Sequence, residues 1–319
     1  MIETIRHQLP HGITLDCRSC GAPGKPLLLF VHGFPEGAFI WDGVMTPFAD
    51  RWRCIAPDLR GYGHSSQPPD VASYKPKALV QDLAALIALE SPGQPAACVI
   101  AHDWGGALAW NLAILHPELL QQLLIINAPH PGTFLRELQH NPAQQAASQY
   151  MHFLRRPDAA TLLLADGARR LWDFFRTPAG PLPDWLTPEL QARYRAHWQQ
   201  SLTTACHYYS ASPLVPPRGD DHRVQQLQLP DSLLSTTVPT QVLWGMQDTA
   251  LRPELLQGLA QWVPQLNVEP VPGASHWLVH EQPAMVIRSL HRLLLSSLTK
   301  REQPQLTQSA SEADFPLDY

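Results

Sequence analysis

An aspartate within a short run of small residues is the first position in the sequence that could do chemistry. The apolar run Cys98–Ala101 leads into A-H-D-W-G-G at residues 101–106, and an apolar helical stretch, Ala107–Leu115, follows. Small residues permit a sharp strand-to-helix turn that lifts the central side chain, Asp103, above a sheet. Its carboxylate is ionised at neutral pH, so it can attack an sp³ carbon without a base and form an alkyl ester. The alternative is an ordinary aspartate that caps the helix.

Two further side chains follow Asp103 in an order that suits stepwise hydrolysis. Asp248 comes shortly after the apolar run Val242–Trp244, and His276 stands between a short predicted strand and the last predicted helix. A histidine oriented by an acid can take a proton from water, and the chain order nucleophile, acid, histidine is an established arrangement for this chemistry. We therefore predict Asp248 as the orienting acid and His276 as the base. A histidine outside such an order is more often a surface or core residue.

The elements that must position these residues form an alternating pattern. Short aliphatic runs predict strands buried on both faces, and they occur at Leu27–Val31, Cys54–Ala56, Cys98–Ala101, Leu123–Ile126 and Val242–Trp244. Apolar residues at three- and four-residue spacing predict two helices, one marked by Leu79, Leu83, Leu86 and Ile87 and one by Val286, Leu290, Leu294 and Leu298. The predicted fold class is α/β, with a mostly parallel, doubly wound sheet.

The pattern changes in the middle of the chain. From about residue 131 to residue 230 the segments are helix-like, rich in Trp, Tyr, His and Gln, and broken by prolines, and the strand pattern resumes only at Pro239. We predict a core in two parts, residues 1–130 and 231–300, with a helical cap inserted at 131–230. The polar, acidic residues 301–319 predict a flexible C-terminal tail.

Composition excludes several classes of partner. The formal net charge of −5, with 16% charged residues, provides no basic surface for nucleic acid. No apolar run reaches the roughly 18 residues that a membrane-spanning helix needs, and residues 1–10 do not have the pattern of a secretory signal. We expect no nucleic-acid or membrane partner and a cytoplasmic protein that is a monomer or a homodimer.

The five cysteines do not predict a disulfide framework or a metal site. Their number is odd and they are spread along the chain. Cys17 and Cys20 match a C-x-x-C pattern, but they lie in a strand-like stretch without a second ligand pair for zinc and without the helix that follows a redox motif. We expect no metal and no cofactor.

Taken together, the motifs resemble those of the α/β-hydrolase superfamily, within the branch that has an aspartate nucleophile. This branch contains epoxide hydrolases, haloalkane dehalogenases and fluoroacetate dehalogenases, and the resemblance covers about residues 3 to 298. The first loop, H-G-F-P-E at residues 32–36, with H-D-W-G-G at 102–106, is most similar to epoxide hydrolases. Haloalkane dehalogenases usually have H-G-N-P in that loop. Ala101 departs from the family, in which glycine is usual at this position. The Asp58–Gly63 loop is interpreted mainly as a structural loop, with little indication of a function.

The resemblance also assigns supporting roles. It implies that the backbone N–H groups of Phe34 and Trp104 form the oxyanion hole. Phe34, Trp104 and Trp277 are the predicted substrate-binding residues. Fluoroacetate dehalogenases carry arginines after the nucleophile to hold the substrate carboxylate, whereas this chain has Trp104 and Ala107 at those places. A small anionic substrate would therefore lack its clamp.

Two cap tyrosines distinguish epoxide chemistry within this branch, because epoxide hydrolases use their hydroxyls to help the ring oxygen leave. One family tyrosine stands seven residues before a proline, which matches Tyr150 before Pro157, and the second follows a helix start that matches Leu186–Glu189, which indicates Tyr194. Tyr208 and Tyr209 could be confused with the functional residue, and each tyrosine could instead be a packing residue.

The sequence thus predicts an epoxide hydrolase that converts an apolar or aromatic epoxide and water to a vicinal diol through an ester on Asp103. The nearest alternative is a haloalkane or haloacid dehalogenase with the same nucleophile, in which a tryptophan such as Trp104 binds the halide. A ligand-binding protein with little turnover, built on the same scaffold, is the alternative of a different class.

Overall fold

An eight-stranded sheet forms the centre of the protein in the computed structural model, which describes residues 1–176 and 180–302, with side chains up to residue 295. The strand order is β1-β2-β4-β3-β5-β6-β7-β8. Strand β2 pairs antiparallel with both β1 and β4, and all the other pairs are parallel. The strands are β1 Glu3–Gln8, β2 Thr14–Cys20, β3 Leu27–Val31, β4 Arg53–Pro57, β5 Cys98–His102, β6 Leu123–Ile126, β7 Thr240–Gly245 and β8 Leu266–Val271. The sheet and its flanking helices confirm the predicted fold class.

The central strands are buried because helices cover the sheet. Every residue of β3, β4, β5, β6 and β7 is buried, as their unbroken apolar runs predict. Helix α2 packs against α3, and α1 packs against α12. The core helices are α1 Asp42–Met45, α2 Pro76–Glu90, α3 Asp103–Leu115, α11 Leu278–Glu281 and α12 Pro283–Glu302. The edge strands β1 and β8 remain partly exposed, and the sequence pattern did not distinguish β1 and β2 as separate strands.

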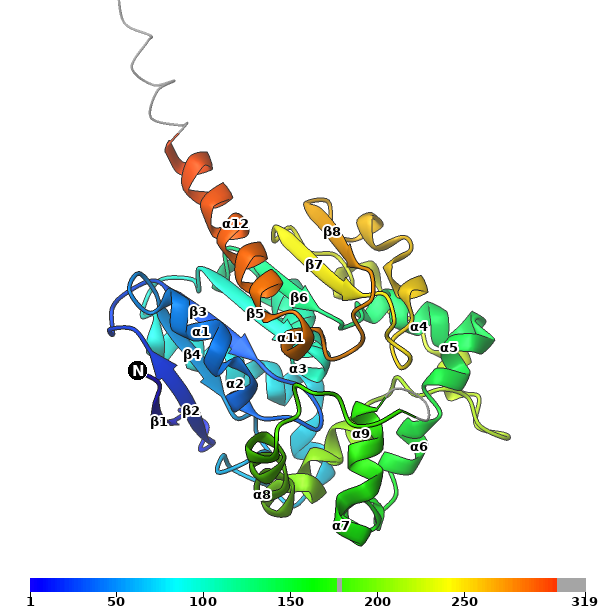
Figure 1. Cartoon of the computed structure of the whole chain (residues 1–319). Coiled ribbons are helices and arrows are strands. Elements are labelled where there is room, and N and C mark those ends of the chain that lie inside the picture. The colour runs from blue at the N-terminus through cyan, green and yellow to red at the C-terminus, as the bar shows by residue number, and fades with distance from the viewer. Residues whose placement is uncertain (177–179, 303–319) are drawn as a thin grey trace, which may run out of the picture.

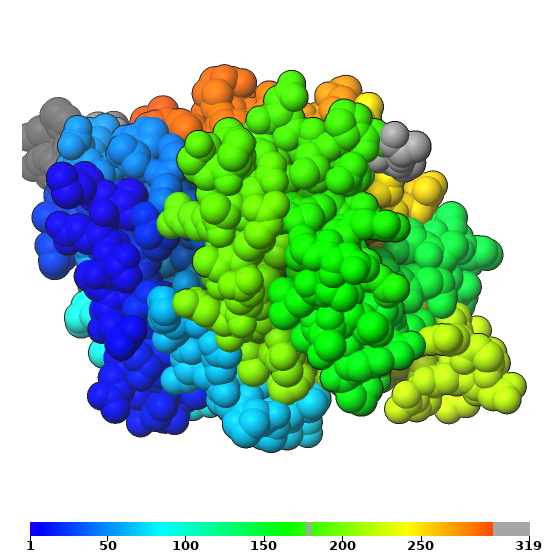
Figure 2. All heavy atoms as spheres, turned by 60° about the horizontal axis from the view of Figure 1, so that its bottom comes forward, coloured from blue at the N-terminus to red at the C-terminus, as the bar shows by residue number. Residues whose placement is uncertain are grey.

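The chain between β6 and β7 contains helices α4 to α10 and contributes no strand to the sheet. They are α4 Pro131–His140, α5 Pro142–Ala147, α6 Tyr150–Leu154, α7 Ala159–Phe175, α8 Pro188–Ala205, α9 His207–Ala211 and α10 Arg223–Gln226. Helices α6 to α9 gather beside the core in Figure 1. Figure 2, in which the bottom of Figure 1 comes forward, shows this green segment across the middle of the molecule. We call residues 127–239 the helical segment.

The C-terminal prediction can be compared only in part. Helix α12 continues to Glu302, so residues 301 and 302 are helical and do not begin a tail. The remainder of the predicted flexible tail, 303–319, lies outside the described residues.

Within the described residues, no helix is both long and apolar enough to cross a membrane. All five cysteines are buried and unpaired.

Candidate active site

Asp103 occupies the turn between β5 and α3, at the carboxyl end of a central strand. Its φ of 51° is in the left-handed region that few residues other than glycine, asparagine and aspartate adopt. The turn also brings α3 close to the end of β3, because a Cβ added to Gly105 would lie 2.4 Å from the carbonyl oxygen of His32. Glycine at that position therefore permits the approach, and the carboxylate of Asp103 is raised above the sheet edge.

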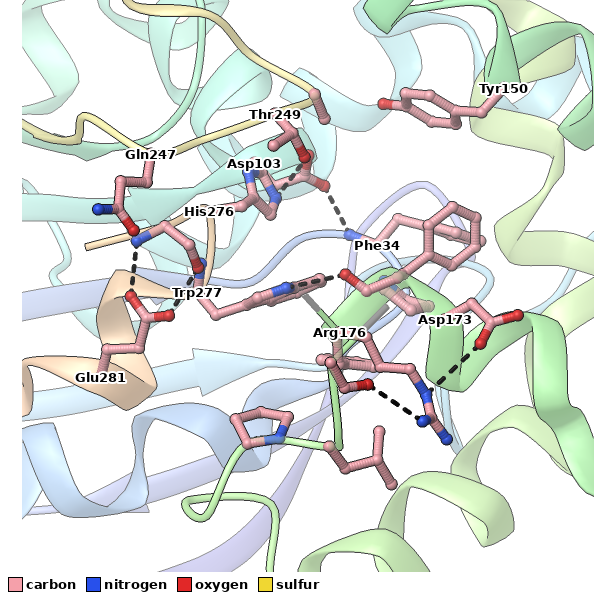
Figure 3. Close-up of a pocket in the computed structure, with 18 of the residues that line it drawn as sticks. Phe34, Asp103, Tyr150, Asp173, Arg176, Gln247, Thr249, His276, Trp277 and Glu281 are labelled. Atoms are coloured by element: carbon pink, nitrogen blue, oxygen red, sulfur yellow. Dashed lines mark hydrogen bonds and ion pairs between the residues drawn. The ribbon is translucent and has the colours of Figure 1, made fainter. Parts of the chain in front are cut away.

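The loop after β3 holds one oxygen of that carboxylate. The backbone N–H of Phe34 donates to Asp103 Oδ1 at 2.7 Å (Figure 3). Gly33 gives the carboxylate room, since a Cβ there would lie 2.4 Å from the same oxygen. The other oxygen, Oδ2, faces the imidazole of His276, with 3.6 Å between it and Nε2. The two carboxylate oxygens thus have different surroundings.

His276 is oriented from behind by a second carboxylate. Its Nδ1 lies 2.7 Å from Asp248 Oδ2, and because a carboxylate only accepts, Nδ1 carries the proton. Burial of the ring opposes its protonation, but the charge and hydrogen bond of Asp248, with smaller effects of Asp103 and Glu36, raise the His276 pKa to about 9. The structure brings Asp103, Asp248 and His276 together, and their roles as nucleophile, acid and base stay predictions.

Asp248 is fixed by four hydrogen bonds, of which one comes from a residue that the sequence analysis missed. Its Oδ1 accepts from the backbone N–H groups of Ala250 and Leu251 at 2.9 and 2.8 Å. Its Oδ2 accepts from Asn127 Nδ2 at 2.8 Å as well as from His276. Asn127 in turn accepts from the N–H of Gly245 at 2.9 Å. The only signal in the sequence for Asn127 is its place directly after β6. It could have indicated a site residue because the carboxyl ends of parallel strands meet at one edge of the sheet.

Two tyrosines from the helical segment face Asp103. Tyr150 and Tyr209 line both cavities that reach Asp103, and Figure 3 shows the Tyr150 hydroxyl directed toward the side of the site that holds Asp103. The Tyr209 ring packs edge to face against Phe34 at 5.1 Å and against Trp104 at 5.2 Å, measured between ring centroids. Burial, and then the charge of Asp103 among other groups, hold the pKa of both phenols above the usual value. Both are therefore neutral hydrogen-bond donors at ordinary pH.

Tyr194 does not take the place that the sequence predicted for it. Its side chain is fully buried and lines neither cavity. Its hydroxyl instead donates to Glu36 Oε1 at 2.5 Å, and this carboxylate oxygen also lies 2.6 Å from Nε2 of His280. The prediction of Tyr194 as a ring-opening acid is corrected for this reason, and Tyr209, from the next helix, stands where the second phenol was expected.

Two cavities of different character meet at Asp103. The larger, of about 1060 Å³, contains Phe34, His276 and Trp277 in its wall. The smaller, of about 280 Å³, contains Trp104 and, apart from Asp103, no charged residue among its lining side chains. The indole N–H of Trp277 donates to the carbonyl of Phe174, so this tryptophan is itself held in the wall (Figure 3). All three predicted substrate-binding residues therefore border a cavity.

Comparison with known families identifies the scaffold. A family model described as "alpha/beta hydrolase fold" matches residues 26–283. The chain belongs to this family. The α/β hydrolase is 34% identical over 281 residues to the AB hydrolase superfamily protein YfhM of Bacillus subtilis, with 86% of this chain and 92% of the relative covered. It is 31% identical to epoxide hydrolase 3 of Xenopus tropicalis, with 89% and 75% covered.

Solved structures show the same likeness. A structure described among novel epoxide hydrolases from metagenomes of hot environments superposes on this α/β hydrolase with a TM-score of 0.82 and 35% identity, covering 92% of this chain and 99% of that one. The crystal structure of Bacillus megaterium epoxide hydrolase in complex with an inhibitor gives a TM-score of 0.80 with 30% identity, covering 91% and 99%. The α/β hydrolase is therefore similar to epoxide hydrolases in sequence and in fold.

A buried charged cluster lies behind the histidine of this α/β hydrolase, and the sequence analysis did not anticipate it. The pKa of Glu36 lies well below its usual value because the attraction of His280 and His102 outweighs the effect of burial. His102 Nδ1 lies 3.2 Å from Glu36 Oε2, and His102 Nε2 donates to the backbone carbonyl of His276 at 2.9 Å. A metal site is not formed in the described part of the chain. Among residues 1–176 and 180–302, no group of three His, Cys, Asp or Glu side chains is arranged to hold a metal ion.

Proposed function

We propose that this α/β hydrolase converts epoxides to vicinal diols through a covalent ester on Asp103. The observation that carries the proposal is the placement of two neutral phenols, Tyr150 and Tyr209, in the walls of the cavities that reach Asp103. A strained ring that opens at carbon needs a nucleophile on one side and a proton donor for the oxygen on the other. Names of related proteins support the same reaction.

In the first step Asp103 Oδ2 attacks a ring carbon and the carbon–oxygen bond on that carbon breaks. Oδ2 is the nucleophilic oxygen because Oδ1 is engaged by the Phe34 N–H. The ring oxygen leaves as an alkoxide, takes a proton from one phenol and accepts a hydrogen bond from the other. The product of this step is a hydroxyalkyl ester of Asp103, with one tyrosine left as a phenolate.

In the second step His276 activates water. Esterification removes the negative charge of Asp103, which is one of the charges that hold the His276 pKa up, so the neutral imidazole becomes more accessible. His276 takes a proton from water, and the hydroxide adds to the ester carbonyl while the Phe34 N–H and the proposed second donor, the Trp104 N–H, stabilise the oxyanion. The intermediate collapses, the bond between the carbonyl carbon and the substrate oxygen breaks, and this oxygen takes the proton from His276 as the diol leaves. The carboxylic acid of Asp103 then loses its proton, which restores the phenol.

The helical segment serves as a cap in this proposal, with residues 131–230 inserted between two parts of the core. It supplies both phenols and much of the apolar wall, including Phe134, Met151 and Leu214 in the smaller cavity. An apolar or aromatic substituent on the epoxide fits such a wall. A dehalogenase has no leaving oxygen that would need two phenols as donors. None of the residues described around the smaller cavity supplies a cation for a carboxylate substrate.

The test compares substrates and traps the intermediate. The protein is expected to turn over styrene oxide or an aliphatic epoxide and to release no halide from haloalkanes. With a His276→Gln variant, intact-protein mass spectrometry should show the added mass of the epoxide, located on the peptide that contains Asp103, because only the second step needs the base. Halide release without diol formation, or a folded His276→Gln variant that binds epoxide but forms no adduct, would overturn the proposal.

A further inference from the structure

Two successive carbonyls of a core loop accept hydrogen bonds from the helical segment. The loop is Asp58–Gly63, directly after β4. The Tyr208 hydroxyl donates to the carbonyl of Arg60 at 2.7 Å, and Thr204 Oγ1 lies 2.6 Å from the carbonyl of Gly61, its shortest contact. Both contacts are buried. They join Thr204, at the end of α8, and Tyr208, in the short helix α9, to the core at a place outside the two cavities.

The loop that provides these carbonyls is held rigidly. The guanidinium of Arg60 makes two hydrogen bonds with Asp82 of α2, at 2.8 and 2.6 Å, and both side chains are buried. A third donor, Nη1, reaches the carbonyl of Ser73 at 2.8 Å, and His11 Nε2 lies 2.7 Å from Asp82 Oδ1. A paired and hydrogen-bonded buried guanidinium fixes the backbone that carries it.

The same loop also reaches the part of the core that holds the Asp103 carboxylate. The Leu59 N–H donates to His32 Nε2 at 3.1 Å, and His32 stands two residues before Phe34. On the helical side, the residue after Tyr208 is Tyr209, and Trp104 packs edge to face against both rings, with centroid distances of 5.7 and 5.2 Å. One loop thus contacts His32, two residues before Phe34, and Tyr208, one residue before Tyr209.

We propose that Tyr208 is a positioning residue, which with Thr204 holds α9 on the Arg60 loop and so sets the distance between the Tyr209 phenol and Asp103. The inference rests on the proposed function, because it assigns the role through the ring-opening step. Displacement of a reacting group by about 1 Å can lower a rate about 100-fold. Since the phenol acts only while the ring opens, loss of the anchor should slow ester formation and leave ester hydrolysis unchanged.

The experiment separates the two steps in single turnovers with enzyme in excess over epoxide. Rapid quenching followed by mass spectrometry gives the rate constant for formation of the protein adduct, and diol release gives the rate constant for its hydrolysis. The variants are Tyr208→Phe, which keeps the ring, and Thr204→Val, which keeps the shape. Thr236→Val is the matched control, because Thr236 Oγ1 donates to a buried core carbonyl, that of Ala113, at the same 2.6 Å.

We expect ester formation to slow about tenfold in Tyr208→Phe, further in the double variant with Thr204→Val, and not at all in Thr236→Val, with hydrolysis constant throughout. Unchanged ester formation in both anchor variants would overturn the inference, and so would an equal fall in both rate constants. If Tyr208→Phe does not fold, Thr204→Val against Thr236→Val gives the same decision. A wild-type protein that forms no ester at all would instead overturn the proposed function.

Discussion

Replacing Tyr194 and Tyr209 separately by phenylalanine should damage the protein in two different ways. Both are buried phenols from neighbouring helices, and phenylalanine keeps either ring in place. Tyr209 faces the cavities at Asp103, whereas the Tyr194 hydroxyl donates to the buried carboxylate of Glu36. The pair therefore tests which hydroxyl takes part in the reaction.

The expected magnitudes follow from what each hydroxyl contacts. Removal of one preorganised donor to a developing oxyanion costs on the order of 100-fold in rate, about 2.7 kcal/mol, so Tyr209→Phe should lower turnover of epoxide by that factor and Tyr150→Phe by a similar one. A hydrogen bond to a charged group contributes about 1.5–3 kcal/mol, so Tyr194→Phe should lower the free energy of unfolding by that amount. Its effect on turnover should be small.

The assays are epoxide turnover under saturating substrate and equilibrium unfolding in denaturant, on all three variants. The Tyr150→Phe and Tyr209→Phe double variant should have almost no activity while it unfolds as a cooperative protein. A Tyr194→Phe variant that loses activity about 100-fold with its stability unchanged would refute the reasoning. So would full activity in Tyr209→Phe, because the second phenol would then be unnecessary.

Three further outcomes are expected. A single turnover in ¹⁸O-water should give mostly unlabelled diol and a labelled Asp103 peptide, since water attacks the ester carbonyl; labelled diol would exclude the nucleophile. The pKa of His276 is raised from 6.5 to about 9, so its ionisation stabilises the fold fully below about pH 6.5, and this contribution of about 3 to 4 kcal/mol is lost as the pH rises through 9. A difference in unfolding free energy between wild type and His276→Gln that does not change between pH 6 and pH 10 would contradict this. Asn127→Asp keeps the acceptor for Gly245 but sets a carboxylate against Asp248, so ester hydrolysis should slow about tenfold or more, and an unchanged single-turnover hydrolysis rate would show that Asn127 does not matter.

The sequence could identify the strands and the three residues at their ends because each is defined by local pattern. Continuous apolar runs mark strands that are buried on both faces, and β3 to β7 are of this kind. Asp103 and Asp248 follow strands of this kind, and His276 follows the partly exposed edge strand β8. Their meeting at one sheet edge is a consequence of parallel topology, because β5, β6, β7 and β8 pair parallel. The exposed edge strand β1 has a mixed pattern and could not be recognised in the same way.

The tyrosine prediction failed for Tyr194 because contacts between residues far apart in the chain determine which tyrosine faces Asp103. Tyr194 and Tyr209 both lie on helices rich in aromatic residues, and helical periodicity does not say which face meets the reacting carboxylate. The hydrogen bond from Tyr194 to Glu36, 158 residues earlier, holds Tyr194 away from the cavities, and packing on Phe34 holds Tyr209 beside them. Glu36 itself belonged to a recognised loop motif, but no pattern in the sequence indicated its buried histidine partners.

The left-handed backbone at Asp103 restricts which amino acids this position can hold, whatever the reaction. Among residues with a side chain, asparagine and aspartate adopt a φ near 51° most readily, and β-branched residues are strained there. An Asp103→Asn exchange can therefore silence the carboxylate and leave the turn in place, whereas valine or threonine would have to distort the junction between β5 and α3. A single backbone angle thus narrows the choice of amino acid at Asp103 before any substrate arrives.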